Sequence, residues 1–327
     1  MNELISIAEV EPGAIIVDEK TKYDNEVITW VVAHHEYGDG YFQEGSTILL
    51  SKNILTLKAF DSIELDKTKS ASERMCGSNN YIHSNILHWL NTRGECRWER
   101  REDVGPYSRV VSCNEYDFEL GFLSTFSDLM LNHMVESNIP INVLSKSNEK
   151  GKLLDVEETY IRNKVFLPSK TELGIPRSKG EGKHFKSGII PVKNNLLLAT
   201  PTEKACKRSK FKRDALSPDK QWYYWTRSAT TKTTEDVALT EVEVVSPTGD
   251  IVPIFSCIGS VGVRPAIAVD MNLLVEQVDY GYYKVSYKRP NFLDKIPTPD
   301  NHKYMMDMVQ DGLSKKIEAH IPEELIK

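Results

Sequence analysis

The sequence predicts an α+β fold with a core of mostly antiparallel strands and a few helices. Aromatic and β-branched side chains are dense in residues 222–270, and such side chains suit a pleated, half-buried surface. Turn residues at 247–250 and 258–261 divide much of this stretch, so we expect a three-stranded meander. Its predicted strands are residues 237–245, 251–257 and 263–269.

The first third of the chain predicts further strands and one short helix. Apolar runs bounded by polar turns indicate the strands, which we place at residues 13–17, 27–33 and 47–55. Residues 84–91 predict the helix, because Ser84 can cap its N-terminus. Ile86, Trp89 and Leu90 share one helical face, which we expect to pack on the core.

The middle of the chain predicts a longer helix and a polar insert. Phe122 and the apolar residues four and seven positions later fall on one face of a helix that reaches about residue 135. Residues 139–143 predict a short strand, and the polar residues 145–158 that follow are interpreted as a flexible insert. Ser169 and Glu172 have the spacing of a capping box, which predicts a helix start after a strand.

Composition limits the classes of function. The 327 residues are 40% hydrophobic, which is enough for a large core in one or two domains. A net charge of −6 argues against general coating of DNA, which needs a basic surface. No apolar run reaches the length of a membrane-spanning helix, and no signal peptide is visible. We therefore expect synthesis in a cytoplasm, with neither nucleic acid nor membrane as a partner.

Metal and disulfide sites are weakly indicated. The cysteines are odd in number, and no two form a Cys-x-x-Cys pair, so we expect free buried thiols. Their positions are Cys76, Cys96, Cys113, Cys206 and Cys257. His34 and His35 lie near Glu36 and Asp39, but adjacent residues of an extended chain point to opposite faces. The sequence therefore predicts no bound metal and no cofactor.

Two arginines, Arg227 and Arg264, lie between apolar neighbours within predicted strands. A guanidinium carries five N–H donors, and in such surroundings these donors need partners. We predict that both arginines are structural, each with a buried stem and a paired head. An exposed arginine that binds an anion is the alternative for each of them.

Basic residues concentrate between residues 203 and 213. The simplest interpretation is the solvated face of a helix. The alternative is a docking patch for an acidic partner, such as a capsid or tail subunit or an anionic cell-wall polymer. That candidate patch comprises Lys207, Arg208, Lys210, Lys212 and Arg213.

Catalytic chemistry has little support in the sequence. Glu115, Asp117 and Glu119 invite a catalytic interpretation, but carboxylates also stabilise a helix N-terminus. The chain has no Gly-x-Ser-x-Gly elbow, no phosphate-binding loop of the Walker type and no His-Glu-x-x-His motif. The sequence therefore predicts a protein that is not an enzyme.

Several motifs carry a resemblance to known families. Residues 225–228 form a Trp-x-Arg-Ser motif, and residues 262–266 read Gly-Val-Arg-Pro-Ala. This order resembles the C-terminal core of C-type-lectin-like domains of the formylglycine-generating-enzyme type. With the Ser-Asn-Ile-x-x-Trp-Leu-Asn element at 84–91, it resembles still more closely a family of unknown function common in phages and prophages of Gram-positive bacteria. Formylglycine-generating enzymes use two cysteines near the final strands, where this chain has only Cys257, so that activity is not expected.

The resemblance covers roughly residues 13–270 and suggests a division of the chain. We predict a C-type-lectin-like domain with insertions at residues 1–270 and a C-terminal extension at residues 271–327. Prolines in the extension predict an extended connector, followed by a helix with a narrow apolar stripe. We interpret that stripe as a candidate assembly helix, formed by Tyr304, Met305, Met308, Val309 and Leu313.

The resemblance implies a bacteriophage virion protein. We expect a structural or decoration protein displayed on the capsid or tail, with other virion subunits and further copies of itself as partners. Binding of a bacterial surface glycan or polymer is a further expectation. The alternatives are a receptor-binding tail protein and a cell-wall-active hydrolase. The expected location is the virion, after synthesis in the host cytoplasm.

Overall fold

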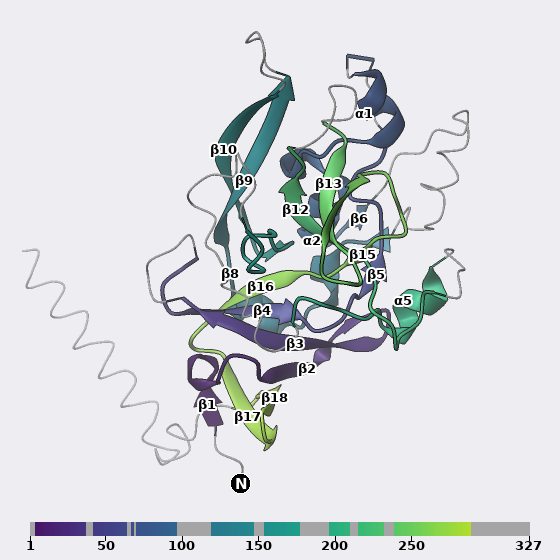
Figure 1. Cartoon of the computed structure of the whole chain (residues 1–327). Helices are drawn as coiled ribbons and strands as arrows, with labels where there is room; N and C mark the ends of the chain where they lie inside the picture. Colours follow the sequence, from purple (N-terminus) through teal and green to yellow (C-terminus); the bar gives the residue numbers. More distant parts are fainter. Residues whose placement is uncertain are drawn as a thin grey trace, which may run out of the picture. The chain divides into compact units, whose positions relative to one another are not determined.

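Two β-sheets organise the chain, and strands pass from one sheet into the other (Figure 1). The computed structural model describes residues 4–36, 42–63, 67–68, 70–96, 119–146, 154–176, 196–209, 215–231 and 239–288. The chain divides into two compact units, Met1–Ser286 and Tyr287–Lys327. All the helices and strands described below belong to the first unit.

The larger sheet has nine strands among the described residues. Its order is β1-β17-β18-β2-β3-β4-β16-β11, and β8 pairs with β16 beside this path. Neighbouring strands are antiparallel except β18 and β2, which run parallel. The bounds are β1 Leu4–Ser6, β2 Ile15–Tyr23, β3 Glu26–His35, β4 Ser46–Ser51, β8 Met134–Val135, β11 Val165–Phe166, β16 Ala266–Asp270, β17 Leu274–Asp279 and β18 Tyr282–Val285.

The smaller sheet has the order β14-β13-β12-β15-β5. Only β12 and β15 run parallel in it. The bounds are β5 Thr56–Leu57, β12 Tyr224–Ala229, β13 Glu241–Val245, β14 Ile251–Phe255 and β15 Gly262–Val263. Two further pairs stand outside both sheets: β6 Glu95–Cys96 with β7 Glu119–Leu120, and β9 Ser137–Lys146 with β10 Leu154–Asn163.

Helices are few and short in the part of the chain that the structure describes. Each α-helix has six residues, and a serine or threonine side chain caps each N-terminus. They are α1 Ala71–Cys76, α2 Asn85–Leu90, α4 Asp128–His133 and α5 Glu203–Arg208. The 3₁₀ turns are η1 Ile7–Glu9, η2 Tyr81–His83 and η3 Phe122–Thr125. None of these helices is long and apolar enough to cross a membrane.

The expectation of an α+β fold is therefore wrong, because strands dominate the described residues. The predicted helix around residues 122–135 shows the reason. The backbone is extended at Phe126 and Ser127, and the Ser127 hydroxyl accepts a hydrogen bond from the Met130 N–H at 3.1 Å, which starts α4 afresh. The chain then leaves α4 to pair as β8 with β16. The apolar residues with helical spacing therefore lie on a 3₁₀ turn, a bend and one short helix instead of on one long helix.

The polar segment at 145–158 was also misjudged, since most of its described residues form strands. The hairpin β9–β10 pairs over ten positions, from Leu154 opposite Lys146 to Asn163 opposite Ser137 (Figure 1). Ile139 and Ile161 face each other near its base and pack against the core. Polar residues nearer its tip hid this alternation from sequence reasoning.

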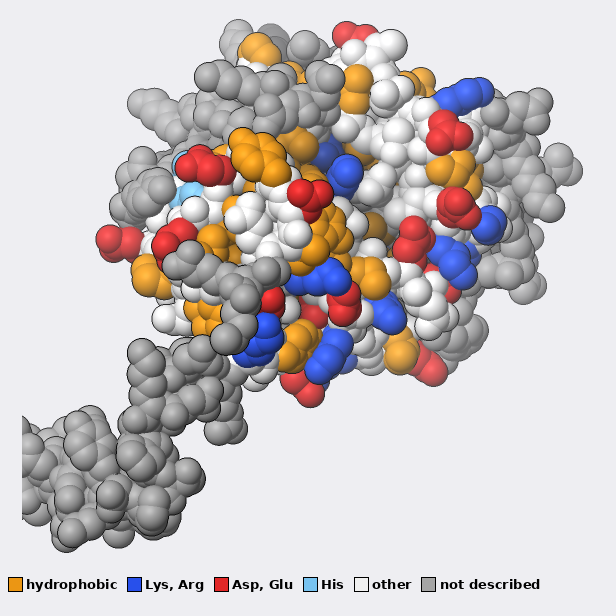
Figure 2. Space-filling model, turned by 90° about the horizontal axis from the view of Figure 1, so that it is seen from below, with side chains coloured by type: hydrophobic (Ala, Val, Ile, Leu, Met, Phe, Trp, Pro, Cys, Tyr) orange, Lys and Arg blue, Asp and Glu red, His pale blue; other side chains and the backbone are white. Residues whose placement is uncertain are grey.

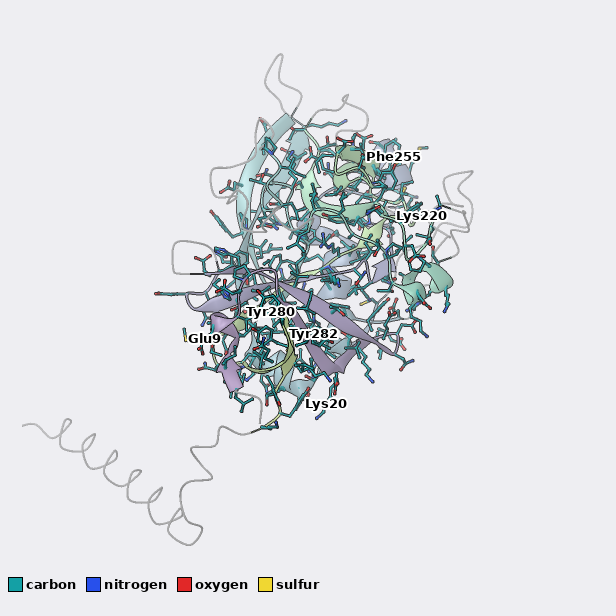
Figure 3. All side chains as sticks on the ribbon, turned by 60° about the horizontal axis from the view of Figure 1, so that its bottom comes forward. Glu9, Lys20, Lys220, Phe255, Tyr280 and Tyr282 are labelled. Atoms are coloured by element: carbon teal, nitrogen blue, oxygen red, sulfur yellow. The ribbon has the colours of Figure 1, made fainter. Side chains whose placement is uncertain are left out.

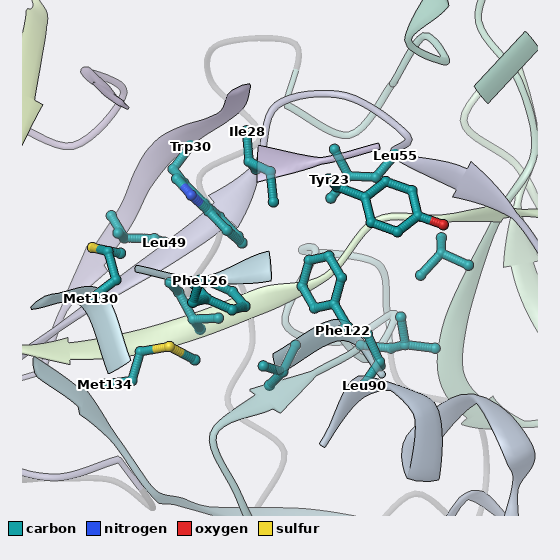
Figure 4. Close-up of a cluster of buried hydrophobic side chains, with 14 of the residues drawn as sticks. Tyr23, Ile28, Trp30, Leu49, Leu55, Leu90, Phe122, Phe126, Met130 and Met134 are labelled. Atoms are coloured by element: carbon teal, nitrogen blue, oxygen red, sulfur yellow. The ribbon is translucent and has the colours of Figure 1, made fainter. Parts of the chain in front are cut away.

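Aromatic rings fill the core beside the larger sheet (Figure 4). The ring centroids of Trp89 and Phe122 lie 5.2 Å apart, and those of Phe122 and Phe126 lie 5.3 Å apart. Trp30 stacks on Phe126 at 6.0 Å, and Tyr23 meets the edge of Trp89 at 5.9 Å. Such ring pairs stabilise a core beyond the area that they bury. The cluster joins β2 and β3 to α2 and η3.

Two chain segments run through both sheets, which the sequence did not predict. The segment of β4 and β5 and the segment of β15 and β16 pair antiparallel in each sheet. The strand predicted at 263–269 therefore divides at Arg264, and only its last part joins the larger sheet. It does not extend the predicted meander, because β15 lies between β12 and β5 rather than beside β14. The hairpin β13–β14 is present.

The first compact unit extends beyond the domain boundary predicted at Asp270. The hairpin β17–β18 inserts between β1 and β2, with Tyr282 opposite Ile15. The side chains of Val275 and Val285 are buried in the core. The unit therefore needs residues up to Ser286 to complete its larger sheet.

We predict that truncation after Ser286 leaves the first unit folded, whereas truncation after Asn272 unfolds it. The longer deletion removes the parallel neighbour of β2 and two buried valines, each of which contributes roughly 1–3 kcal/mol of burial. Thermal unfolding followed by circular dichroism measures both variants. If both truncated proteins unfolded in equally cooperative transitions, the β17–β18 hairpin would be dispensable for folding.

Candidate functional site

Four cationic side chains are buried among the residues that the structure describes: Lys58, Lys170, Arg227 and Arg264. A buried cation is costly unless it is paired and hydrogen-bonded, so their partners show what each one does. Each of them contacts chain segments that lie far away in the sequence. We therefore treat these cations and their partners as the candidate functional residues of the described structure.

Arg227 on β12 forms a two-point ion pair with Glu172. Its Nη2 lies 2.5 Å from Glu172 Oε1, its Nη1 donates to Oε2 at 2.6 Å, and neither side chain is exposed to solvent. The same guanidinium donates to the backbone oxygens of Leu167 at 2.8 Å and Pro140 at 3.1 Å. Arg227 thus connects β12 to β9 and to the segment after β11.

Ser169 and Glu172, which have capping-box spacing, position the carboxylate that pairs with Arg227. The Ser169 N–H donates to Glu172 Oε2 at 2.8 Å, and the Glu172 N–H donates to the Ser169 hydroxyl at 3.1 Å. The two residues close a turn rather than beginning the predicted helix. The turn orients the Glu172 carboxylate toward Arg227. Beside it, Lys170 forms a buried ion pair with Glu243 of β13 at 2.5 Å.

Arg264 occupies the point where its strand passes from the smaller sheet to the larger one. Its Nε donates to the Ser51 carbonyl at 2.9 Å, and its Nη1 donates to the Leu196 carbonyl at 2.5 Å. The guanidinium also lies over the Tyr224 ring, 5.2 Å from its centroid. Burial lowers the pKa of Arg264, against the opposing effect of Tyr224. Among the described residues, backbone carbonyl dipoles and the face of an aromatic ring stabilise the charge of Arg264.

A second cluster forms around Lys58, which follows β5. Its Nζ lies 2.5 Å from Glu119 Oε2 on β7 and 4.6 Å from the centroid of the Trp89 ring. Glu119 Oε1 accepts from the Tyr23 hydroxyl at 2.7 Å and from Arg208 Nη1 at 3.3 Å. Burial lowers the pKa of Lys58 to about 7, although the Glu119 carboxylate opposes that shift. One carboxylate thus joins β5, β2 and α5.

The Lys58 cluster combines residues that the sequence had placed in separate hypotheses. Glu119 was one of three candidate acids, and Arg208 belonged to the candidate basic patch. Sequence reasoning missed Lys58 and Tyr23. A lone lysine between apolar residues, in the order Thr-Leu-Lys-Ala-Phe at 56–60, was the available signal. An amine with a pKa near 7 is chemically a base, but this one is fully buried against a carboxylate.

The remaining basic and acidic candidates are divided between described and undescribed residues. Lys207 is exposed and pairs with Glu203 one helical turn away at 2.8 Å, so it lies on a solvated face of α5. The other residues of the candidate patch and of the candidate acids lie outside the described residues, as does the candidate assembly helix. They are Lys210, Lys212, Arg213, Glu115, Asp117, Tyr304, Met305, Met308, Val309 and Leu313.

The histidine pair does not form a metal centre in the described structure. The two ring nitrogens of His35 lie 2.9 Å from the Thr47 hydroxyl and 2.7 Å from the Val10 carbonyl, so hydrogen bonds engage both. Asp39 lies outside the described residues. No group of three or more His, Cys, Asp or Glu side chains within the described ranges is arranged to hold a metal ion.

A comparison with family models places these residues in a known sequence family. The model described as a domain of unknown function (DUF6273) matches residues 44–271. The chain belongs to this family. The match runs from β4 to β16, so it includes Arg227, Arg264 and Lys58 with their ionic partners Glu172 and Glu119. No curated protein and no solved structure matches the chain.

We predict that Arg227→Ala lowers the free energy of unfolding by about 3–5 kcal/mol, because it leaves the buried Glu172 carboxylate without its counter-charge. Denaturant unfolding measures the loss. Replacing Arg227 and Glu172 together by methionine should restore part of it, since no buried charge then remains unpaired. Lys207→Ala removes an exposed pair and should leave the midpoint unchanged. A wild-type midpoint for Arg227→Ala would contradict the structural role.

We also predict a pH dependence that belongs to Lys58. Its pKa is about 7 in the folded protein against a reference value of 10.5, so between these values the unfolded chain binds more protons. The stability of the wild type relative to Lys58→Met should therefore rise by about 2 kcal/mol between about pH 7 and about pH 9. Glu119 keeps Tyr23 and Arg208 as partners in this variant. A flat or falling difference would contradict the shifted pKa.

Proposed function

We propose that the protein is a structural or decoration protein of a bacteriophage virion, displayed on the capsid or tail. The family match is coarser than this proposal, because it gives a domain of unknown function. The phage origin and the relation to C-type-lectin-like domains rest on the motifs at 225–228 and 262–266 and belong to the same proposal. Arg227 and Arg264, the arginines of those motifs, both donate hydrogen bonds to backbone carbonyls of distant chain segments. That use favours a scaffold over a catalytic centre.

Exposed apolar residues on the β17–β18 hairpin and its flanks carry the proposal. Eight large hydrophobic residues are exposed among those described, and three of them lie between residues 271 and 280 of the first compact unit. We call this group the β17–β18 surface: Met271, Val278 and Tyr280. Figure 2 shows the face that carries the hairpin, where hydrophobic side chains stand among charged ones. Exposed large apolar side chains of this kind support the proposal of a contact surface on the hairpin.

Tyr280 is the most exposed residue of the β17–β18 surface, since 96% of it is exposed at the hairpin turn. Figure 3 shows Tyr280 and Tyr282 on this hairpin. Tyrosine supplies a large rigid contact area with a polar tip, and it is enriched at the centres of protein interfaces. Lys284 and Glu19 pair at 2.5 Å on neighbouring strands and provide a charged rim. We propose that this surface contacts another virion subunit.

The proposal is tested on intact particles. Antibody labelling or imaging should place the protein on the outside of the capsid or tail. Its absence from purified particles would overturn the proposal. If the protein were a hydrolase, the purified protein would instead release fragments from cell walls. The Glu119→Gln variant would then lose that activity. A receptor-binding tail protein would be found only at the tail tip and would compete with infection when added in soluble form.

We predict that Tyr280→Ser lowers incorporation into particles by about tenfold, because it removes the most exposed aromatic side chain of this surface. The fraction of protein that sediments with particles measures the effect. Tyr160→Ser on β10, a comparably simple change at another exposed tyrosine, is the matched control and should incorporate normally. The melting temperature of both variants should match the wild type. If the double variant with Tyr280→Ser and Val278→Ser were incorporated as well as the wild type, the proposed contact through this surface would be wrong.

A further inference from the structure

Two cysteines that are far apart in the sequence meet beside the smaller sheet. Cys76 is the last residue of α1, and Cys257 follows β14. The Cys257 N–H donates to the Cys76 carbonyl at 3.0 Å, and the same carbonyl accepts from the Ser256 hydroxyl at 2.7 Å. This hydrogen bond places the two backbones in direct contact, and a disulfide needs such an approach because it spans Cα atoms about 5–6 Å apart.

The side chains of the two cysteines pack in one buried cluster. Their interaction lowers the pKa of Cys76 and raises that of Cys257. Both residues are buried free cysteines, and they form an apolar cluster with Ile63. A lowered pKa makes Cys76 the better thiolate, and the thiolate is the form that attacks a disulfide.

The backbone around the pair is held firmly. Gly77 has a φ of +74°, and a side chain there would collide with the carbonyl oxygens of Asp61 and Ser62. Ser256 also accepts hydrogen bonds through its carbonyl from the N–H groups of Phe60, at 2.8 Å, and Asp61, at 3.1 Å. The cysteines are thus held in place by the surrounding chain before any bond forms between them.

We propose that Cys76 and Cys257 form an oxidation site, which closes to a disulfide when the protein meets glutathione disulfide or a similar disulfide oxidant. The Cys76 thiolate attacks one sulfur of the oxidant and releases one glutathione. Cys257 then loses its proton and attacks Cys76 in the mixed disulfide, which releases the second glutathione. Two electrons pass from the two thiols to the oxidant, and two protons leave the cysteines.

The closed bond would join the segment of α1 to the end of β14. It would close a loop of most of the chain, and disulfides across long loops restrict the unfolded state most. The protein would be made with free thiols in a reducing cytoplasm and would gain the bond only after leaving it. The inference does not depend on the proposed function, because any exit to an oxidising compartment has the same effect.

The test uses the full-length protein, incubated under native conditions with glutathione disulfide or with reduced glutathione. The remaining thiols are then alkylated in denaturant, and the peptides are mapped by mass spectrometry. We expect a peptide that links Cys76 to Cys257 in the oxidised sample alone. The melting temperature should rise on the order of 10 °C and return after addition of dithiothreitol.

Cys257→Ser and Cys76→Ser should each lose the linked peptide and the rise in melting temperature. Cys206→Ser on α5 is the matched control and should keep both. Peptide mapping of the wild type decides the proposal even where a serine variant fails to fold. Alkylation of both cysteines after oxidation, or a linkage of either one to a different cysteine, would overturn the oxidation site.

Discussion

The fold depends on one crossing point, where two paired chain segments pass from the larger sheet into the smaller one. The segment of β4 and β5 and the segment of β15 and β16 stay side by side through both sheets. At the crossing the sheet ladders are interrupted, so backbone carbonyls lose their usual partners. Arg264 donates to the carbonyl of Ser51 at the end of β4 and to that of Leu196, a residue outside both sheets. Its five N–H groups make arginine suited to this position, where lysine offers only one charged point.

Buried ion pairs extend the same principle to the rest of the first unit. Arg227 with Glu172, Lys170 with Glu243, and Lys58 with Glu119 each join segments that no continuous sheet connects. Replacing such pairs by apolar residues is often neutral for stability, so their net contribution is smaller than their Coulomb attraction suggests. A buried charge does penalise alternative arrangements that leave it unpaired. These pairs therefore favour one relative placement of β5, β7, β9, β12 and β13.

Local patterns predicted several strands that lie in one sheet. The apolar runs at 27–33 and 251–257 correspond to β3 and β14, whose partners lie nearby in the sequence. The helix predicted near Phe122 failed because Ser127 caps a new helix on an extended backbone. The strand predicted at 139–143 lies within β9, but its partner β10 was missed because the polar tip of the hairpin obscured the packing of Ile161 at its base. Tertiary packing outweighed local propensity in both places.

The sequence by itself determined that the strands dominate residues 222–270 and that Arg227 and Arg264 need partners, since each interrupts an apolar run. It also showed the capping-box spacing of Ser169 and Glu172, although the helix start predicted from that spacing is wrong. Only the tertiary structure decided which groups those partners are, that Lys58 meets Glu119, and that Cys76 meets Cys257. The reason is physical: spacing and periodicity act over a few residues, whereas these contacts join segments separated by tens to hundreds of residues. Their pairing exists only once the two sheets have closed on a common core.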